Sequence, residues 1–210
     1  MSTTDDRVYN RVMELKNDPK KLLAYVFTEP MALEYIENQT PELCLTAVSA
    51  YSNALMYVRN QTPELCLIAV MGNGLIREHV KNQTPEICLA AVKENGYALR
   101  FVREQTPEIC LIAVMNAGLA LEYVREQTPE ICLAAVRHAG LALQDVKKQT
   151  PEICLTAVQR NGIALSYVRE QTPEICMAAV KQNSDALKYV KDNEIKRMLL
   201  HEKIKDKQGE

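Results

Sequence analysis

Apolar residues recur along this chain in a pattern that repeats every 22 residues. The phrase Gln-Thr-Pro-Glu-(Leu/Ile)-Cys-(Leu/Met)-x-Ala-Val occurs seven times, and its copies, 1 to 7, begin at Gln39, Gln61, Gln83, Gln105, Gln127, Gln149 and Gln171. A fixed period of this length is typical of stacked repeat proteins, in which each repeat buries its apolar face against its neighbours. We number each copy from its glutamine, position 1, to position 22.

Each copy carries the signals for two short helices. Threonine at position 2 can cap a helix, proline at position 3 suits the first helical residue, and glutamate at position 4 meets the positive end of the helix dipole. The apolar set at positions 5, 6, 7, 9 and 10 follows, until a pair such as Asn95-Gly96 ends the helix. We expect this glycine to adopt the left-handed conformation that commonly closes a helix.

A second helix of about two turns is predicted after the glycine, for example over residues 97–103. Ala98, Leu99 and Val102 fall on its buried side. Position 21 is arginine or lysine in every copy, and we expect this basic side chain to complement the negative end of its own helix.

The two ends of the chain depart from the repeat, as expected for caps that meet water on one side. Residues 1–16 predict a leading helix with Val8, Val12 and Leu15 at helical spacing, and residues 17–38 form a degenerate copy in which Asp18-Pro19 replaces Thr-Pro and Leu22 replaces cysteine. After Asp192 a closing helix is predicted, with Ile195, Met198 and Leu199 facing inward.

These patterns predict an all-α protein, a right-handed α-solenoid of seven 22-residue two-helix repeats. A degenerate capping repeat precedes the array and a capping helix follows it. As one continuous domain it divides into residues 1–38, residues 39–192 and residues 193–210.

The repeat resembles a known family. The sequence QTPEICLAAVKxNGxAL, at residues 83–99, is similar to the repeats of the family called domain of unknown function 4116, DUF4116, and the similarity extends over roughly residues 39–190. The resemblance implies an all-helical module found in bacterial, protist and large-virus proteins, with no assigned activity and no catalytic residues. Copy 2, with Leu75-Ile76-Arg77 in place of an Ala-Leu pair, and copy 7, with Ser184-Asp185, depart from the pattern.

Charge and cysteine usage narrow the classes of function. A net charge of −2 and a pI near 6.0 argue against a protein that holds nucleic acid mainly by counterion release. The seven cysteines all occupy position 6, and stacked helices separate equivalent residues by about 8–10 Å, too far for a disulfide. We therefore expect reduced thiols and a cytoplasmic location, or the host-cell cytoplasm if a pathogen or virus encodes the chain. Neither a signal peptide nor a membrane span is expected.

No group of residues indicates catalysis. The three histidines, His79, His138 and His201, have no second ligand or base at helical spacing, and the cysteines form no Cys-x-x-Cys pair. We therefore predict no enzyme activity, no metal and no cofactor, and a core role for the cysteines.

Positions at which the copies differ are the better candidates for recognition. Positions 8 and 11 share a helix face with the glutamate at position 4, so this stripe is predicted to be exposed. Packing under a neighbouring helix or loop is the competing interpretation. The candidate partner-binding residues at these positions are Ile68, Met71, Ile112, Met115, Lys93, Arg137, Gln159 and Lys181.

The second helices have a variable face of their own, with Arg100, Glu122, Gln144, Ser166 and Lys188. Aromatic residues lie beside it in five copies, and packing between second helices is the favoured interpretation of them. Arg77 is irregular, because a leucine is usual at its position.

The predicted function is that of a repeat scaffold that binds a protein partner, as an adaptor or inhibitor, in a host-pathogen or viral setting or as a homo-oligomer. One alternative is a modular reader of RNA or single-stranded nucleic acid, favoured by the periodic basic residues. Another is a protein that sequesters a small ligand, for which Arg77 is the indication. No membrane association is expected.

Overall fold

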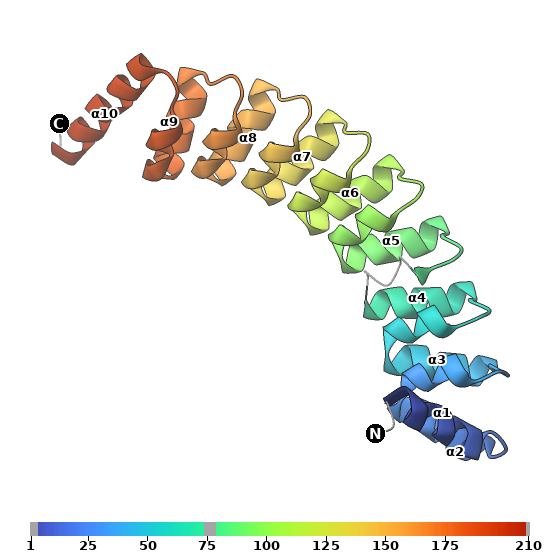
Figure 1. Cartoon of the computed structure of the whole chain (residues 1–210). Helices are drawn as coiled ribbons and strands as arrows, with labels where there is room; N and C mark the ends of the chain where they lie inside the picture. Colours follow the sequence, from blue (N-terminus) through green and yellow to red (C-terminus); the bar gives the residue numbers. More distant parts are fainter. Residues whose placement is uncertain (1–3, 74–78, 209–210) are drawn as a thin grey trace. The chain divides into compact units, whose positions relative to one another are not determined.

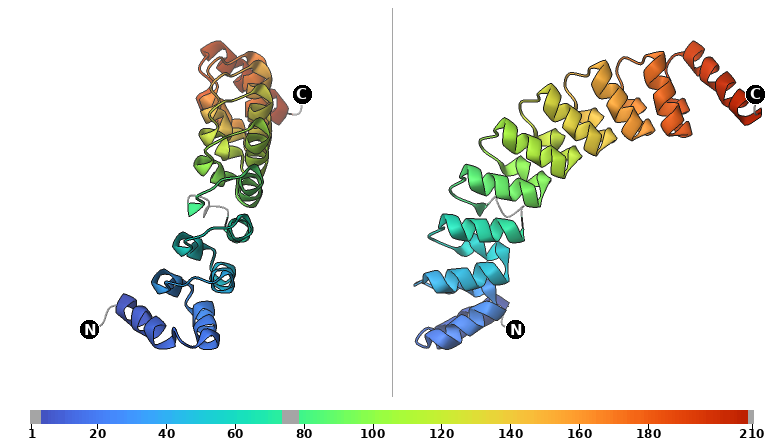
Figure 2. Two further views of the ribbon diagram at one scale, coloured as in Figure 1. Left: turned by 90° about the vertical axis from the view of Figure 1, so that its right-hand side faces the viewer. Right: turned by 180° about the vertical axis from the view of Figure 1, so that it is seen from behind.

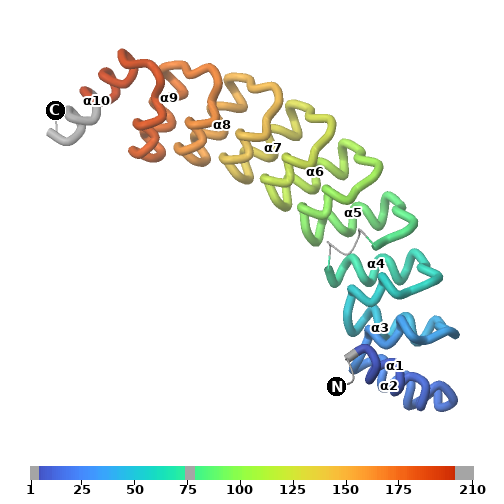
Figure 3. Tube along the Cα trace, viewed as in Figure 1, coloured from blue at the N-terminus to red at the C-terminus, as the bar shows by residue number. Residues whose placement is uncertain are grey.

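The structure is a computed structural model that describes residues 4–73 and 79–208. In these two ranges every regular element is a helix, and no strand occurs. The chain divides into two compact units, Met1–Arg103 (unit 1) and Glu104–Glu210 (unit 2). Figure 1 shows the succession of helices within each unit, and Figure 3 traces the same succession along the backbone.

Unit 1 begins with two helices that precede the regular repeats, and then alternates α-helices with short 3-10 helices, labelled η. Its described elements are α1 (Thr4–Leu15), α2 (Pro19–Thr28), η1 (Pro30–Tyr35), α3 (Pro41–Ala50), η2 (Ser52–Tyr57), α4 (Pro63–Gly72), α5 (Pro85–Glu94) and η4 (Gly96–Phe101).

Unit 2 continues the alternation and ends with a longer helix. Its elements are α6 (Pro107–Asn116), η5 (Gly118–Tyr123), α7 (Pro129–His138), η6 (Gly140–Asp145), α8 (Pro151–Arg160), η7 (Gly162–Tyr167), α9 (Pro173–Gln182), η8 (Ser184–Tyr189) and α10 (Asn193–Gln208). The second helix of each described copy is therefore a six-residue 3-10 helix, which makes about two turns at three residues per turn.

Each α-helix starts as the sequence predicts. In all seven copies the threonine hydroxyl accepts a hydrogen bond from the backbone N–H three residues later, and proline is the first helical residue. The degenerate copy uses Asp18 in the same way, because its carboxylate accepts from the Lys21 N–H at 3.2 Å. The start of the helix is thus fixed by three or four consecutive residues, without help from distant parts of the chain.

The core lies between a layer of α-helices and a layer of 3-10 helices, which Figure 2 shows from two further sides. α7, for example, packs against α6 and α8 and also against η5 and η6. The 3-10 helices contribute most of the largest buried side chains, and Leu99, Leu121 and Leu143 are completely inaccessible to solvent. Helices of six to ten residues are marginal alone, so this packing supplies the stability of each repeat.

The glycine after each α-helix has a different role from the predicted one. Gly118, Gly140 and Gly162 do not adopt the left-handed conformation; instead, the residue before them is extended, as at Ala139 with φ of −139°. A Cβ atom on Gly140 would lie 2.5 Å from the carbonyl oxygen of Ala157 in the next copy. Glycine is required because the next α-helix approaches the backbone at this point.

The two ends of the chain act largely as predicted caps. Val12 and Leu15 of α1 are buried, and α1 packs against α2 and η1. At the other end Leu199 of α10 is buried and Ile195 is half-buried, but Met198 is 40% exposed, so the prediction that it faces inward is wrong. α10 packs against α9, and consecutive residues of a helix point about 100° apart, so this one line of contact covers Leu199 and not Met198.

Among the described helices, none combines the length and the apolar composition that crossing a membrane requires.

Candidate functional site

Two surfaces compete as the functional site. The first is the edge formed by the loops that join successive copies, which we call the loop edge and define by the glutamines at position 1 and the basic residues at position 21. The second is the α-face, defined by positions 4, 7, 8 and 11 of the α-helices.

A ladder of glutamine side chains holds the loop edge together. Gln127 donates from Nε2 to the carbonyl of Asp145 at 2.9 Å, and its Oε1 accepts from the N–H of Lys147 at 2.9 Å and from Cys132 Sγ at 3.6 Å. All seven glutamines bind the same carbonyl and N–H of their own copy, at positions 19 and 21. No role for this glutamine was predicted from the sequence.

The same amide also reaches the preceding copy in four places. The Nε2 atoms of Gln39, Gln61, Gln149 and Gln171 donate to the carbonyls of Leu33, Leu55, Leu143 and Leu165 in the 3-10 helix before them. A glutamine amide has two N–H donors and one carbonyl acceptor. Where both N–H groups and the oxygen are occupied in this way, little hydrogen-bonding capacity is left for a ligand.

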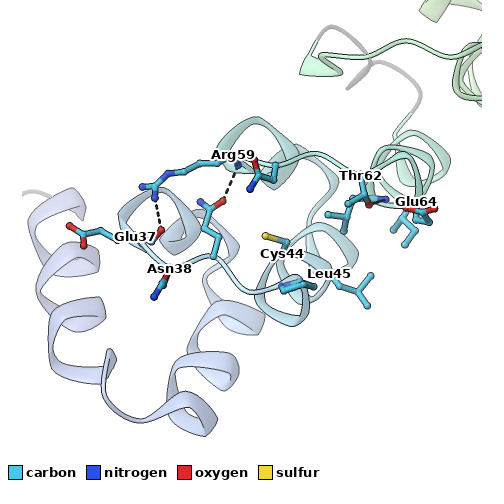
Figure 4. A pocket seen from close by; sticks show the side chains of 12 residues that line it. Glu37, Asn38, Cys44, Leu45, Arg59, Thr62 and Glu64 are labelled. Carbon is cyan, nitrogen blue, oxygen red and sulfur yellow. Dashed lines mark hydrogen bonds between the residues drawn. The ribbon is translucent and has the colours of Figure 1, made fainter.

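The basic residues at position 21 also bind the preceding copy. Lys147 Nζ donates to the carbonyl of Arg125 at 2.8 Å, and Arg169 does the same to the carbonyl of Lys147 at 2.8 Å. Figure 4 shows the corresponding bond from Arg59 to the carbonyl of Glu37. Bonds of this kind lead one period upstream, so the prediction that the basic residues serve their own helix is wrong for these five: Arg59, Lys81, Lys147, Arg169 and Lys191.

Small cavities lie between neighbouring loops on this edge. One of them has a volume of about 500 Å³ and is lined by Cys44, Leu45, Arg59, Thr62 and Ile68 among others (Figure 4). The equivalent cavities beside Cys154 and Cys110 measure about 340 Å³ and 220 Å³. Each cavity is lined by the ladder glutamine of its copy, Gln39, Gln149 or Gln105, whose amide already binds backbone groups of the chain.

The cysteines are core residues, as predicted. All seven are buried and unpaired by disulfides. Burial raises the pKa of the thiols of Cys44, Cys66, Cys110, Cys132, Cys154 and Cys176 above its usual value. A buried neutral thiol is a poor nucleophile. No three His, Cys, Asp or Glu side chains within residues 4–73 and 79–208 come together as a metal site.

The α-face is exposed at positions 4 and 11, as the sequence predicts, but position 8 is half-buried in every copy except copy 2. Glutamate at position 4 is exposed in all seven copies, and Met71 and Met115 are 66% and 61% exposed. Ile68 is just exposed, whereas Ile112 is half-buried and only partly available to a partner. The polar candidates of this face, Lys93, Arg137, Gln159 and Lys181, are all exposed.

The structure brings some of these candidates together. In unit 2 a groove of about 650 Å³ runs between α6 and α7, where Met115 and Arg137 meet Leu111, Leu133 and Ala134. Gln159 and Lys181 occupy the same position on α8 and α9. In unit 1, Ile68 and Met71 lie on α4 and Lys93 lies on α5.

The residue at position 7, leucine or methionine, is a further part of this surface that was not predicted. It was assigned to the apolar core, but Leu45 is 45% exposed and Met177 is 41% exposed. Leu111 and Leu133 line the groove. The signal was present, because position 7 lies three residues after the exposed glutamate and four before the variable position 11.

The variable face of the 3-10 helices is exposed at Arg100, Glu122, Gln144, Ser166 and Lys188. Two of its cations lie over aromatic rings, Arg100 over Phe101 at 4.2 Å and Lys188 over Tyr189 at 4.9 Å. Arg77, the irregular residue of copy 2, falls outside the described residues.

Comparison with known proteins agrees with the repeat. The sequence profile described as Domain of unknown function (DUF4116) matches residues 84–127, 128–172 and 151–196, which together cover more than half of the chain. No curated protein and no solved structure matches it. The resemblance inferred from the repeated phrase is thereby confirmed, and the chain belongs to the DUF4116 family.

Proposed function

We propose that this chain is a non-catalytic scaffold that binds a protein partner through the α-face. The observation that carries the proposal is the groove between α6 and α7, where Met115 is 61% exposed beside Leu111 and Leu133. A cluster of exposed apolar side chains surrounded by charged ones is typical of protein-binding sites. Methionine suits such a site because its flexible, polarizable side chain adapts to a partner.

The contrast with the loop edge supports the choice of face. The glutamines and basic side chains of that edge bind the backbone of the chain itself. A partner there would have to break these bonds before forming its own. On the α-face, a partner gains by covering apolar side chains that water already contacts.

The finer features of the proposal follow from the repeat. The stack is a right-handed α-solenoid of seven copies that acts as an adaptor or an inhibitor, in the cytoplasm of a cell or of an infected host. Seven buried, unpaired cysteines support a reducing compartment. A high-resolution experimental structure would test the handedness.

A reader of single-stranded nucleic acid is the second candidate. The exposed cations that lie over Phe101 and Tyr189 favour it, because aromatic and cationic groups together can hold bases. The basic residues at position 21 weigh against it, since Lys147, Arg169 and Lys191 already donate to backbone carbonyls. A gel shift against mixed RNA and DNA pools at low salt decides between them: the scaffold proposal expects no shift at micromolar protein.

The scaffold proposal is tested by removing the apolar side chains of the α-face. In a variant with Ile68, Met71, Ile112 and Met115 all changed to serine, we expect the partner to be lost while circular dichroism stays unchanged. The matched control is Met56→Ser, because Met56 is 45% exposed but lies on η2, away from this face. Proteins cross-linked to the wild type and to the control in the native host, but not to the variant, would support the proposal. Equal recovery from a well-folded variant would contradict it.

A further inference from the structure

The α-face of unit 2 carries two rows of charge at its opposite borders. The acidic row consists of the first-turn glutamates of α6 to α9, Glu108, Glu130, Glu152 and Glu174. The basic row consists of Arg137 and Lys181 at position 11 of α7 and α9, together with Arg160 at position 12 of α8, all in the last turns of their helices. Leu111, Leu133 and Met177, at position 7, occupy the apolar strip between the rows, and Met115 takes the place of the basic residue at position 11 of α6. Figure 1 shows α6 to α9 side by side in this order.

The two rows do not neutralise each other within the molecule. In the described part of unit 2, no ion pair involves any of these seven side chains. The reason is geometric, because the acidic and basic positions of one helix lie seven or eight residues apart, about 10–12 Å along its axis. Arg160 donates from Nε to the carbonyl of His138 at 3.4 Å, which orients the guanidinium without neutralising it.

His138 takes no part in the basic row. Its Nδ1 accepts a hydrogen bond from the N–H of Gly118 at 3.1 Å, which requires a ring nitrogen without a proton. The charge of this border therefore rests on the two arginines and the lysine.

We propose that the partner of this face is a second copy of the same chain, a proposal that rests on the scaffold function above. A two-fold axis that lies in the interface, parallel to the row from α6 to α9, reverses the helix direction of the second copy. The acidic row of each copy then meets the basic row of the other, and the apolar strips face each other. Such a self-complementary, isologous contact is the commonest form of homodimer interface.

Charge repulsion disfavours the alternative dimer, in which the two copies are related by a different two-fold axis. A two-fold axis parallel to the helices would place acidic row on acidic row and basic row on basic row, and like charges in contact cost several kcal/mol. Charge thus selects one orientation and fixes its register.

The α-face of unit 1 lacks a basic row, so the charge complementarity between two copies is specific to unit 2. Its helices carry the first-turn glutamates Glu42, Glu64 and Glu86, but α3 and α4 have no basic residue in the last turn and α5 has only Lys93. Two copies of this face would bring acidic rows together without a matching basic row.

The area of the contact predicts a weak, reversible dimer. Four helices about 15 Å long and about 9–10 Å apart present roughly 600 Å² per copy, or about 1,200 Å² in total. This is the lower limit for stable interfaces, and complexes of this size are usually transient.

A charge-swap experiment with the full chain tests the proposal. The first variant carries Arg137→Glu, Arg160→Glu and Lys181→Glu, and the second carries Glu130→Lys, Glu152→Lys and Glu174→Lys. We expect the wild type to self-associate over roughly 10–500 µM in sedimentation velocity, and each variant alone to associate at least tenfold more weakly. Mixed in equal amounts, the two variants should form a heterodimer, because all-acidic and all-basic borders then face each other.

The outcomes separate this inference from the scaffold proposal. A monomeric wild type, or a mixture that stays monomeric while circular dichroism shows both variants folded, overturns the second-copy inference. The scaffold proposal still stands in that case if cross-linking recovers a different protein from wild type and not from the quadruple serine variant. As a control for simple charge repulsion, Lys20→Glu on α2 of unit 1, an exposed residue outside the α-face, should leave the association constant unchanged.

Discussion

The loop edge and the α-face of copy 5 differ in what their side chains already bind. On the loop edge, the amide of Gln127 binds a backbone carbonyl, a backbone N–H and the thiol of Cys132. On the α-face, Leu133 and Arg137 border an open groove. The glutamine and the cysteine, which are constant in all seven copies, are thus bound within the fold, whereas position 11, which varies between copies, borders the groove.

The comparison shows that the side chains bound within the fold are the same in every copy because the stacking of the repeats requires them. Gln, Thr, Pro and Cys recur because each binds or packs against a neighbour that also recurs. Position 11 changes from methionine to arginine, glutamine and lysine, and its side chain is exposed in all seven copies.

The largest expected effect concerns the core that supports both surfaces. Leu143→Ala should lower the free energy of unfolding by about 2–5 kcal/mol, because Leu143 is completely buried and the change leaves a cavity. Urea denaturation followed by circular dichroism measures this value. A change below about 0.5 kcal/mol would show that the packing between the two helical layers is wrong.

Breaking the ladder should have the next largest effect. Gln127→Ala removes the partners of the Asp145 carbonyl and the Lys147 N–H, so we expect a loss of about 1–3 kcal/mol in the free energy of unfolding. The matched control is Gln144→Ala, an exposed glutamine of the same copy that binds only the neighbouring Asp145 carboxylate. Equal effects of the two substitutions would remove the distinction between the ladder and an ordinary surface.

Alkaline pH should lower the free energy of unfolding, because the buried thiols beside the loop edge ionise more easily in the unfolded chain. Burial holds the pKa of the thiols of Cys132 and Cys154 above its usual value, so these thiols stay neutral when folded but ionise at about pH 8.5 when unfolded. Their stabilising contribution is complete below that pH and is lost as pH rises toward the folded pKa. The free energy of unfolding should fall by about 1.4 kcal/mol per pH unit for each thiol that unfolding exposes.

The control for this pH dependence is a variant in which Cys132 and Cys154 are both alanine. Its free energy of unfolding, measured by urea denaturation at several pH values above about 8.5, should fall less steeply with pH than that of the wild type. Identical slopes would mean that other groups cause the alkaline loss.

The smallest expected effect on stability belongs to the α-face. Met115→Ser should change the free energy of unfolding by less than about 0.5 kcal/mol, because the side chain is 61% exposed. It should nevertheless weaken self-association measured by sedimentation. A loss of stability comparable to that of Gln127→Ala would mean that Met115 belongs to the fold rather than to a binding surface.

Features that depend on neighbouring residues were predictable from the sequence. Thr128, Pro129 and Glu130 start α7 by interactions within one turn, and the same signal was legible in Asp18-Pro19 of the degenerate copy. The burial of cysteine and the exposure of Met71 and Met115 also followed, because helical periodicity alone assigns residues to faces.

Features that depend on the next copy were not predictable in the same way. The hydrogen bond from Lys147 Nζ to the Arg125 carbonyl spans 22 residues and joins copy 5 to copy 4. Gly140 is explained only by the carbonyl of Ala157 in the following helix. To predict either contact one must know how far apart the stacked copies lie, and the periodicity of the sequence does not give that distance. The α6–α7 groove was missed for a related reason, since Leu111 and Leu133 belong to different copies.

The reach of the glutamine ladder has a consequence for how such a chain changes length. The hydrogen bonds of these glutamines described above extend no further than six residues back and 20 residues forward. Duplicating or deleting one complete 22-residue segment therefore restores every bond at the junction, wherever in the repeat the cut falls. A gain or loss of any other number of residues leaves an amide without its carbonyl. Unequal recombination within the gene can thus lengthen or shorten the protein by whole repeats, each step yielding a chain that still folds.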